Sequence, residues 1–152
     1  MFLALLVGTA VLLGSVLLYG IALGMVVMLV VRLIHHGYTG LSLWRNVAIM
    51  MAVTSITATA HVIQIVVWAG LFLACGEVPT FETALYFSAQ SYTAVGYGDV
   101  ALSQRWRLLG PLEAINGLLL FGLSTSVMFA VMSRLITNRL HRLFGEEGKH
   151  DE

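Results

Sequence analysis

Residues 93–99, with the sequence TAVGYGD and called the glycine segment below, are the part of the chain best suited to bind an ion. Gly96 and Gly98 flank Tyr97, and glycine permits backbone conformations in which a side chain would clash. Such a backbone can turn successive carbonyl oxygens toward one axis, where they replace the water around an ion. The segment therefore predicts ion binding by main-chain atoms.

The rest of the chain is too apolar for a water-soluble protein. Of its 152 residues 59% are hydrophobic and 11% are charged, with a mean hydropathy of +0.89. Soluble domains carry about 25% charged residues. Most of the chain is therefore expected in a lipid bilayer, as one compact unit with a few spanning helices. The net charge is zero, so no nucleic-acid partner is expected, and no motif calls for an organic cofactor.

Three long apolar stretches predict three transmembrane helices, since about 20 apolar residues suffice to cross a bilayer. The first, residues 1–33, is interpreted as a retained peripheral span, because it lacks the basic start of a signal peptide. The other two are an outer helix at 46–75 and an inner helix at 106–137. They belong to a predicted pore domain at 44–142, which a short cytoplasmic tail at 143–152 follows.

Residues 80–92 predict a helix that is too short to span the membrane. Thr80 is a suitable N-cap, and Glu82 lies in the first turn, where the helix dipole favours an anion. A segment of this length is often re-entrant. Non-helical backbone at membrane depth survives only where it lines a cavity or is buried in protein. A short helix followed by the glycine segment therefore predicts a pore loop.

The basic residues predict the orientation. Two arginines flank the first loop, and four basic residues cluster near the C-terminus: Arg32 and Arg45, then Arg134, Arg139, Arg142 and Lys149. The positive-inside rule makes both regions cytoplasmic, so the N-terminus and the glycine segment face outward. The expected location is the inner (plasma) membrane of the cell, in a multi-pass arrangement.

Residues 95–99, VGYGD, resemble the selectivity filter of potassium channels, and the chain resembles a small bacterial member of that family. The resemblance covers about residues 78–139, which would hold the pore helix, the filter and the inner helix. It implies that residues 93–99 form the filter and that K⁺ ions bind the carbonyl oxygens of Val95, Gly96 and Tyr97. These ions are the only non-protein component expected.

The implied fold is an all-α membrane protein with three transmembrane helices, a re-entrant pore helix and an extended filter. The chain holds one filter segment and no repeat of it. Four such segments are needed to close a ring of carbonyls, so a homotetramer is expected.

The resemblance also assigns supporting residues. Tyr86 and Phe87 match pore-helix aromatics that support the filter tyrosine, Tyr97. Gln90 stands where the family often has a glutamate that faces the aspartate behind the filter, here Asp99. A glutamine can donate a hydrogen bond to Asp99, but it cannot share a proton with it.

The filter departs from the family pattern at Ala94, which replaces the usual threonine and follows Thr93. Alanine has no hydroxyl to offer to an ion, so a weaker innermost site and an altered conductance are expected. The carbonyls of Val95, Gly96 and Tyr97 remain, and potassium selectivity is expected to survive.

Glycines interrupt the predicted inner helix. The resemblance implies a gating hinge near Gly117, with Gly122 as a second flexible position; close packing against a neighbouring helix is the alternative. Gly122, Ser126 and Ala130 are four residues apart, so they share a helix face that could line the cavity below the filter.

Polar residues also occur inside the second and third spans. His61 and Gln64 share one helix face, as do Glu113 and Asn116. Ionisable residues inside a membrane suggest function, and a His–Glu pair could sense pH. An interhelical hydrogen-bond network that holds the subunit together is the alternative. Likewise, the first span either packs on the second or takes part in gating.

The sequence therefore predicts a channel that passes K⁺ down its electrochemical gradient, and not an enzyme, because no catalytic constellation is present. Two alternatives stay open. One is a poorly selective monovalent cation channel, on account of Ala94. The other is a non-conducting accessory subunit of another membrane protein.

Overall fold

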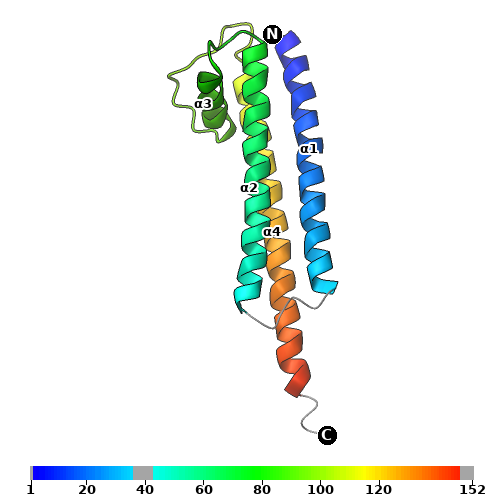
Figure 1. The fold of residues 1–152 in the computed structure, drawn as a ribbon. Coiled ribbons are helices and arrows are strands. Elements are labelled where there is room, and N and C mark those ends of the chain that lie inside the picture. Colours follow the sequence, from blue (N-terminus) through cyan, green and yellow to red (C-terminus); the bar gives the residue numbers. More distant parts are fainter. Residues whose placement is uncertain (1, 36–42, 148–152) are drawn as a thin grey trace. The chain divides into compact units, whose positions relative to one another are not determined.

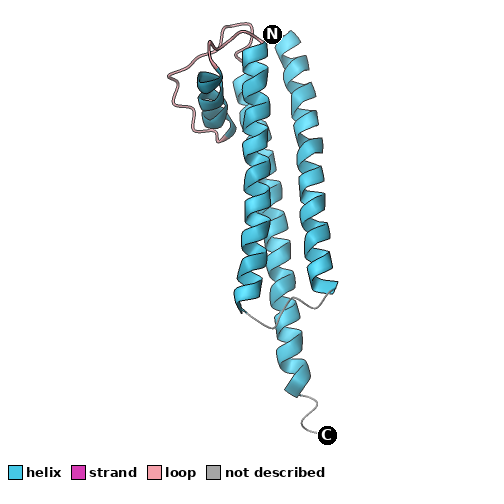
Figure 2. Cartoon of the chain, viewed as in Figure 1, coloured by secondary structure: helices cyan, strands magenta, loops and turns pink. Residues whose placement is uncertain are grey.

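The computed structural model describes residues 2–35 and 43–147, with side chains up to Arg139. It contains four helices: α1 (Phe2–His35), α2 (Leu43–Ala74), α3 (Phe81–Tyr92) and α4 (Leu109–Glu147). None of the described residues forms a strand, and loops connect α2 to α3 and α3 to α4 (Figure 2). Three helical stretches are long and apolar enough to cross a membrane, namely α1, α2 and the Leu109–Arg139 part of α4. The predicted all-helical membrane protein with three spans is confirmed.

The last helix differs most from its predicted bounds of 106–137. It begins later because residues 106–108 form a turn, in which the Leu109 N–H donates to the Trp106 carbonyl at 2.9 Å. It ends ten residues later, at Glu147. The prediction stopped where the apolar run stopped, but no proline follows in residues 138–147, so the backbone hydrogen bonds continue. Residues 143–147 of the predicted tail are thus helical, and 148–152 lie outside the described residues.

The other helices lie close to their predicted bounds. The first span ends at His35 instead of residue 33, and the second runs from Leu43 to Ala74 instead of 46–75. The short helix begins at Phe81, directly after its N-cap Thr80, and ends at Tyr92. Deviations of this size at helix ends are ordinary, because terminal turns depend on individual capping bonds.

The chain divides into two compact units, each built from parts of α1, α2 and α4. Unit 1, Met1–Ile21 with Thr59–Leu123, also contains α3, which lies beside the C-terminal part of α2 (Figure 1). Its core joins α2, α3 and α4 through these buried residues: Trp68, Ala69, Phe72, Val78, Ala84, Phe87 and Leu109. The rings of Phe72 and Phe87 meet nearly at right angles, with centroids 4.9 Å apart. This core fixes α3 against the longer helices.

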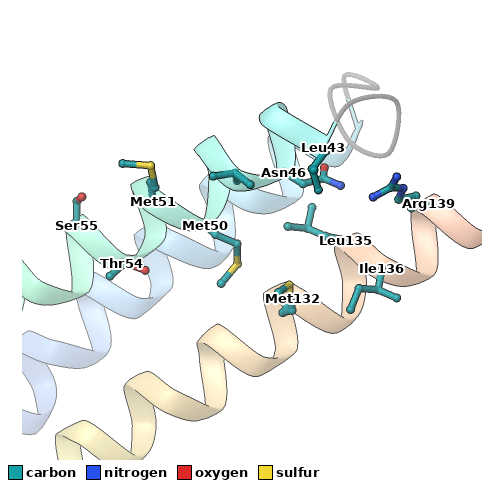
Figure 3. A pocket seen from close by; sticks show the side chains of 11 residues that line it. Leu43, Asn46, Met50, Met51, Thr54, Ser55, Met132, Leu135, Ile136 and Arg139 are labelled. Carbon is teal, nitrogen blue, oxygen red and sulfur yellow. The ribbon is translucent and has the colours of Figure 1, made fainter.

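Unit 2 comprises Ala22–Ala58 and Ser124–Glu152. Its core takes two apolar residues from each helix: Val26 and Val30, Ile49 and Val53, Val131 and Leu135. A pocket of about 510 Å³ lies between α2 and α4 (Figure 3). Its lining is mostly apolar, with Asn46 and Arg139 at one end. Such a lining suits a hydrocarbon group better than an ion.

Large apolar side chains are exposed along α1 of the single chain. Leu13, Leu17 and Ile21 are each at least 60% exposed. A monomeric soluble protein rarely exposes a contiguous apolar surface of this kind. The face therefore suits contact with lipid or with other membrane helices.

Candidate ion-binding segment and its support

The short helix α3 leads directly into the glycine segment. At its start, the Thr80 hydroxyl accepts a hydrogen bond from the Thr83 N–H at 3.2 Å, which confirms Thr80 as the N-cap. At its end, the N–H of Thr93 still donates to the Ala89 carbonyl, and the Thr93 hydroxyl donates to the same carbonyl at 2.8 Å. Both ends of α3 are thus satisfied locally.

The sign of φ alternates along the glycine segment. It is positive at Ala94 (57°), Gly96 (58°) and Gly98 (79°), and the residues between them are not in this region. Glycine adopts a positive φ without cost, whereas an L-residue such as Ala94 loses about 1–2 kcal/mol there. The conformation is held despite that cost, so other contacts must maintain it.

Those contacts converge on Gln90. Its main-chain carbonyl accepts the N–H groups of Val95 and Gly96, at 2.9 and 3.3 Å. Its side-chain Oε1 accepts the N–H of Tyr97 at 2.8 Å. Three successive N–H groups therefore point toward one residue of α3.

The carbonyls of the same peptide groups point the other way. In a trans peptide the C=O of one residue is antiparallel to the N–H of the next. The carbonyls of Ala94, Val95 and Gly96 are therefore turned away from Gln90. This set shares Val95 and Gly96 with the predicted ligands and adds Ala94. The predicted role of the Tyr97 carbonyl stays a prediction.

Gln90 also holds the far end of the segment. Its Nε2 donates to Asp99 Oδ1 at 3.1 Å, the hydrogen bond that the sequence suggested. The side chain is only 5% exposed, so it uses both ends of its amide in a largely buried position. Its bond to Tyr97 was missed by sequence reasoning, because nothing in the local sequence marks a residue seven positions away as a partner.

The two aromatic residues of α3 that were predicted to support Tyr97 have different surroundings. The Tyr86 hydroxyl interacts with Asp99, and this interaction is the main reason why the pKa of Asp99 is lowered. Phe87 packs on Phe72 in the core of unit 1. Tyr97 itself is 72% exposed in the single chain, so its predicted support by Tyr86 and Phe87 stays a prediction.

Replacing Tyr86 by phenylalanine should raise the pKa of Asp99 toward its ordinary value. The hydroxyl stabilises the carboxylate form of Asp99. Its contribution to the stability of the fold is therefore complete at a pH above the pKa of Asp99 in the unfolded chain, and it is lost as the pH falls through the lowered pKa of the folded state. A carboxyl-carbon NMR titration of Asp99 in both proteins measures the change. An Asp99 pKa that is equal in the two proteins would contradict the contact.

A second carboxylate, that of Glu77, holds the loop that follows the glycine segment. Glu77, just beyond α2, accepts the Ser103 N–H at 2.6 Å and the Ser103 hydroxyl at 2.8 Å. The loop between α3 and α4 is thus tied to the end of α2. The sequence offered no signal for this pair, because the two residues are 26 positions apart.

The four polar residues of the spans have different surroundings. His61 forms hydrogen bonds with the hydroxyls of Tyr19 and Tyr92. Gln64 donates a hydrogen bond to the Ser15 carbonyl at 2.9 Å. Glu113 accepts a short hydrogen bond from the Ser88 hydroxyl. Asn116 is fully buried, and its side-chain amide has no hydrogen-bond partner among the described residues. His61 and Glu113 thus take part in interhelical hydrogen bonds, as in the alternative interpretation, and a pH-sensing role for these residues stays a prediction.

The two glycines suggested as hinges differ sharply. A Cβ on Gly117 would lie 1.9 Å from the Tyr92 carbonyl oxygen, so α4 approaches the end of α3 closely at this point. A Cβ on Gly122 would meet nothing within 4 Å. Close packing thus explains Gly117. Gly122, Ser126 and Ala130 are exposed in the single chain, and their role in lining a cavity stays a prediction.

A family model matches the region that holds these features. Residues 60–134 match the family model described as "Ion channel". The match supports an ion-channel family. It spans α3, the glycine segment and Gly117, and together with the three apolar spans it points to a membrane channel and not an enzyme. Comparison with curated proteins and with solved structures gave no match.

Proposed function

We propose that the protein is a potassium-selective channel, in which four copies pass K⁺ passively down its electrochemical gradient. One observation carries this proposal: the N–H groups of Val95, Gly96 and Tyr97 all bond Gln90, which turns three successive carbonyls to the opposite side. A row of carbonyls with no protein donor of its own is what an ion needs in place of its hydration shell.

The proposed tetramer follows from how many carbonyl rows are needed around an ion. One chain supplies one row of carbonyls, and four rows close the ring that surrounds an ion. All seven residues of the glycine segment are exposed in the single chain, as expected of a surface that meets the other copies. No cofactor besides the K⁺ ions is proposed.

The proposed membrane arrangement places α3 as a re-entrant pore helix. Its 12 residues span about 18 Å at 1.5 Å per residue, which is too short to cross a bilayer. Among residues 22–35, 43–58 and 124–139 of unit 2, four arginines and no acidic residue occur. This end is proposed to face the cytoplasm of a plasma-membrane protein, with the N-terminus outside.

A second candidate is a monovalent cation channel with poor selectivity. The observation that favours it is Ala94, which begins the alternating backbone but has no side-chain oxygen. An innermost site with fewer oxygens would discriminate less between K⁺ and Na⁺.

Ion flux into liposomes that hold the purified protein tests the proposal. We expect the K⁺ flux to exceed the Na⁺ flux by more than about tenfold, a ratio that needs only about 1.4 kcal/mol of discrimination. Equal fluxes would favour the second candidate. Absence of flux for both ions, from a tetramer shown to be intact, would contradict both.

Two glycine variants provide a matched control for this flux. Gly96→Ala adds a second L-residue at a φ near 58° beside Ala94, and this strain should lower the selective flux at least about tenfold. Gly14→Ala on α1 meets nothing within 4 Å and should leave the flux unchanged. Equal behaviour of the two variants would show that the glycine segment is not the ion pathway.

A further inference from the structure

The part of α1 in unit 1, residues 2–21, lies outside the matched ion-channel region, yet it is hydrogen-bonded to the end of α3 through one side chain of α2. The Nε2 of His61 lies 3.0 Å from the Tyr19 hydroxyl of α1. The Nδ1 of the same ring lies 2.8 Å from the Tyr92 hydroxyl of α3. Both tyrosines are fully buried. Three helices of unit 1 therefore meet at one imidazole.

The hydrogen-bond roles of the two tyrosines are linked. A neutral imidazole has one donor and one acceptor nitrogen, so one tyrosine hydroxyl must donate to the ring and the other must accept. The ring also contacts those of Tyr19 and Phe121, with centroids at 4.9 and 4.5 Å and tilts of 37° and 31°. His61 cannot turn without losing these contacts, so the position of Tyr19 constrains that of Tyr92.

Tyr92 in turn constrains the glycine segment. It is the last residue of α3, and Thr93 begins the segment. Its main chain lies against Gly117 of α4, and its ring lies edge-on to Phe121 at 5.6 Å. Held by α4 on one side and by His61 on the other, Tyr92 sets where the segment begins.

We propose that Tyr19 and His61 are positioning residues for the ion pathway, so that residues 2–21 of α1 fix the start of the glycine segment through Tyr92. The role in ion passage rests on the proposed channel function; the positional effect on the segment does not.

Gln64 provides a matched control. It also joins α1 to α2, since its Nε2 donates to the Ser15 carbonyl at 2.9 Å, and it is equally buried. Its hydrogen bond to Ser15 of α1 does not reach α3. Loss of this bond should weaken the contact between α1 and α2 without changing the amide exchange rates of the glycine segment.

Amide hydrogen exchange in the assembled full-length protein tests the proposal directly. Tyr19→Phe removes one hydroxyl and keeps the ring. We expect the N–H groups of Val95, Gly96 and Tyr97 to exchange about tenfold faster, as loss of one hydrogen bond can shift a local equilibrium. Gln64→Met should leave these three groups at the wild-type rate. No change in Tyr19→Phe, or the same change in both variants, would overturn the proposal.

A double variant tests whether the two tyrosines act through one path. If His61 transmits the effect, Tyr19→Phe should add little to the exchange change caused by Tyr92→Phe. Independent, additive effects would overturn the proposal.

Flux measurements separate this proposal from that of potassium selectivity. If the wild type selects K⁺, Tyr19→Phe should lower the K⁺/Na⁺ flux ratio several-fold and Gln64→Met should not. If the wild type does not select K⁺, the proposed selectivity fails, and the exchange result still decides the role of Tyr19.

Discussion

Replacement of Gly117 by alanine is expected to destabilise the fold by more than about 3 kcal/mol, the upper end of the usual cost of overpacking. The added Cβ would lie 1.9 Å from the carbonyl oxygen of Tyr92 and 2.9 Å from its carbonyl carbon. These are main-chain atoms at the end of α3, so they cannot move aside as the tip of a flexible side chain can. Thermal unfolding in detergent, together with the fraction of assembled protein, measures the effect.

Gly122→Ala is the control for this change. It lies on the same helix, five residues away, and an added Cβ meets nothing within 4 Å. Alanine is favoured over glycine within a helix by about 1 kcal/mol, so this variant should be as stable as the wild type or more stable. If Gly117→Ala unfolded at the wild-type temperature but failed to conduct, the hinge interpretation would replace close packing.

Replacement of Gln90 should have the second large effect. Gln90→Leu keeps the approximate volume but removes the acceptor for the Tyr97 N–H and the donor to Asp99. An unsatisfied buried group costs about 1–3 kcal/mol, enough to lower selective flux on the order of 10- to 100-fold. Liposome flux measures the loss. Wild-type flux in this variant would show that Gln90 does not hold the glycine segment.

Gln90→Glu should instead make the flux depend on pH. A carboxylate can still accept the Tyr97 N–H, but it can donate to Asp99 only when it is protonated. Two facing carboxylates repel each other at neutral pH and share a proton when the pH falls. The variant should therefore conduct better at pH 5 than at pH 8, whereas the wild type should show no such rise. A flux that is independent of pH in the variant would contradict a direct contact between residues 90 and 99.

The sequence by itself determined the helical membrane fold and the place of the candidate site. Three apolar stretches gave the spans, because crossing a bilayer requires only length and apolar composition. Thr80 marked the start of α3, because capping is a bond within one turn. Gly96 and Gly98 marked the unusual backbone, and both adopt a positive φ. Each of these features depends on neighbours in the chain, so it can be recognised locally.

The tertiary structure decided which residues support the site. His61 pairs with Tyr19 and Tyr92, 42 and 31 positions away. Gly117 proved to be a packing position because the end of α3 lies against it. Gln90 bonds Tyr97 because the segment folds back along α3. These contacts join residues that are separated along the chain, and their geometry is set by how the helices pack, which no local pattern encodes.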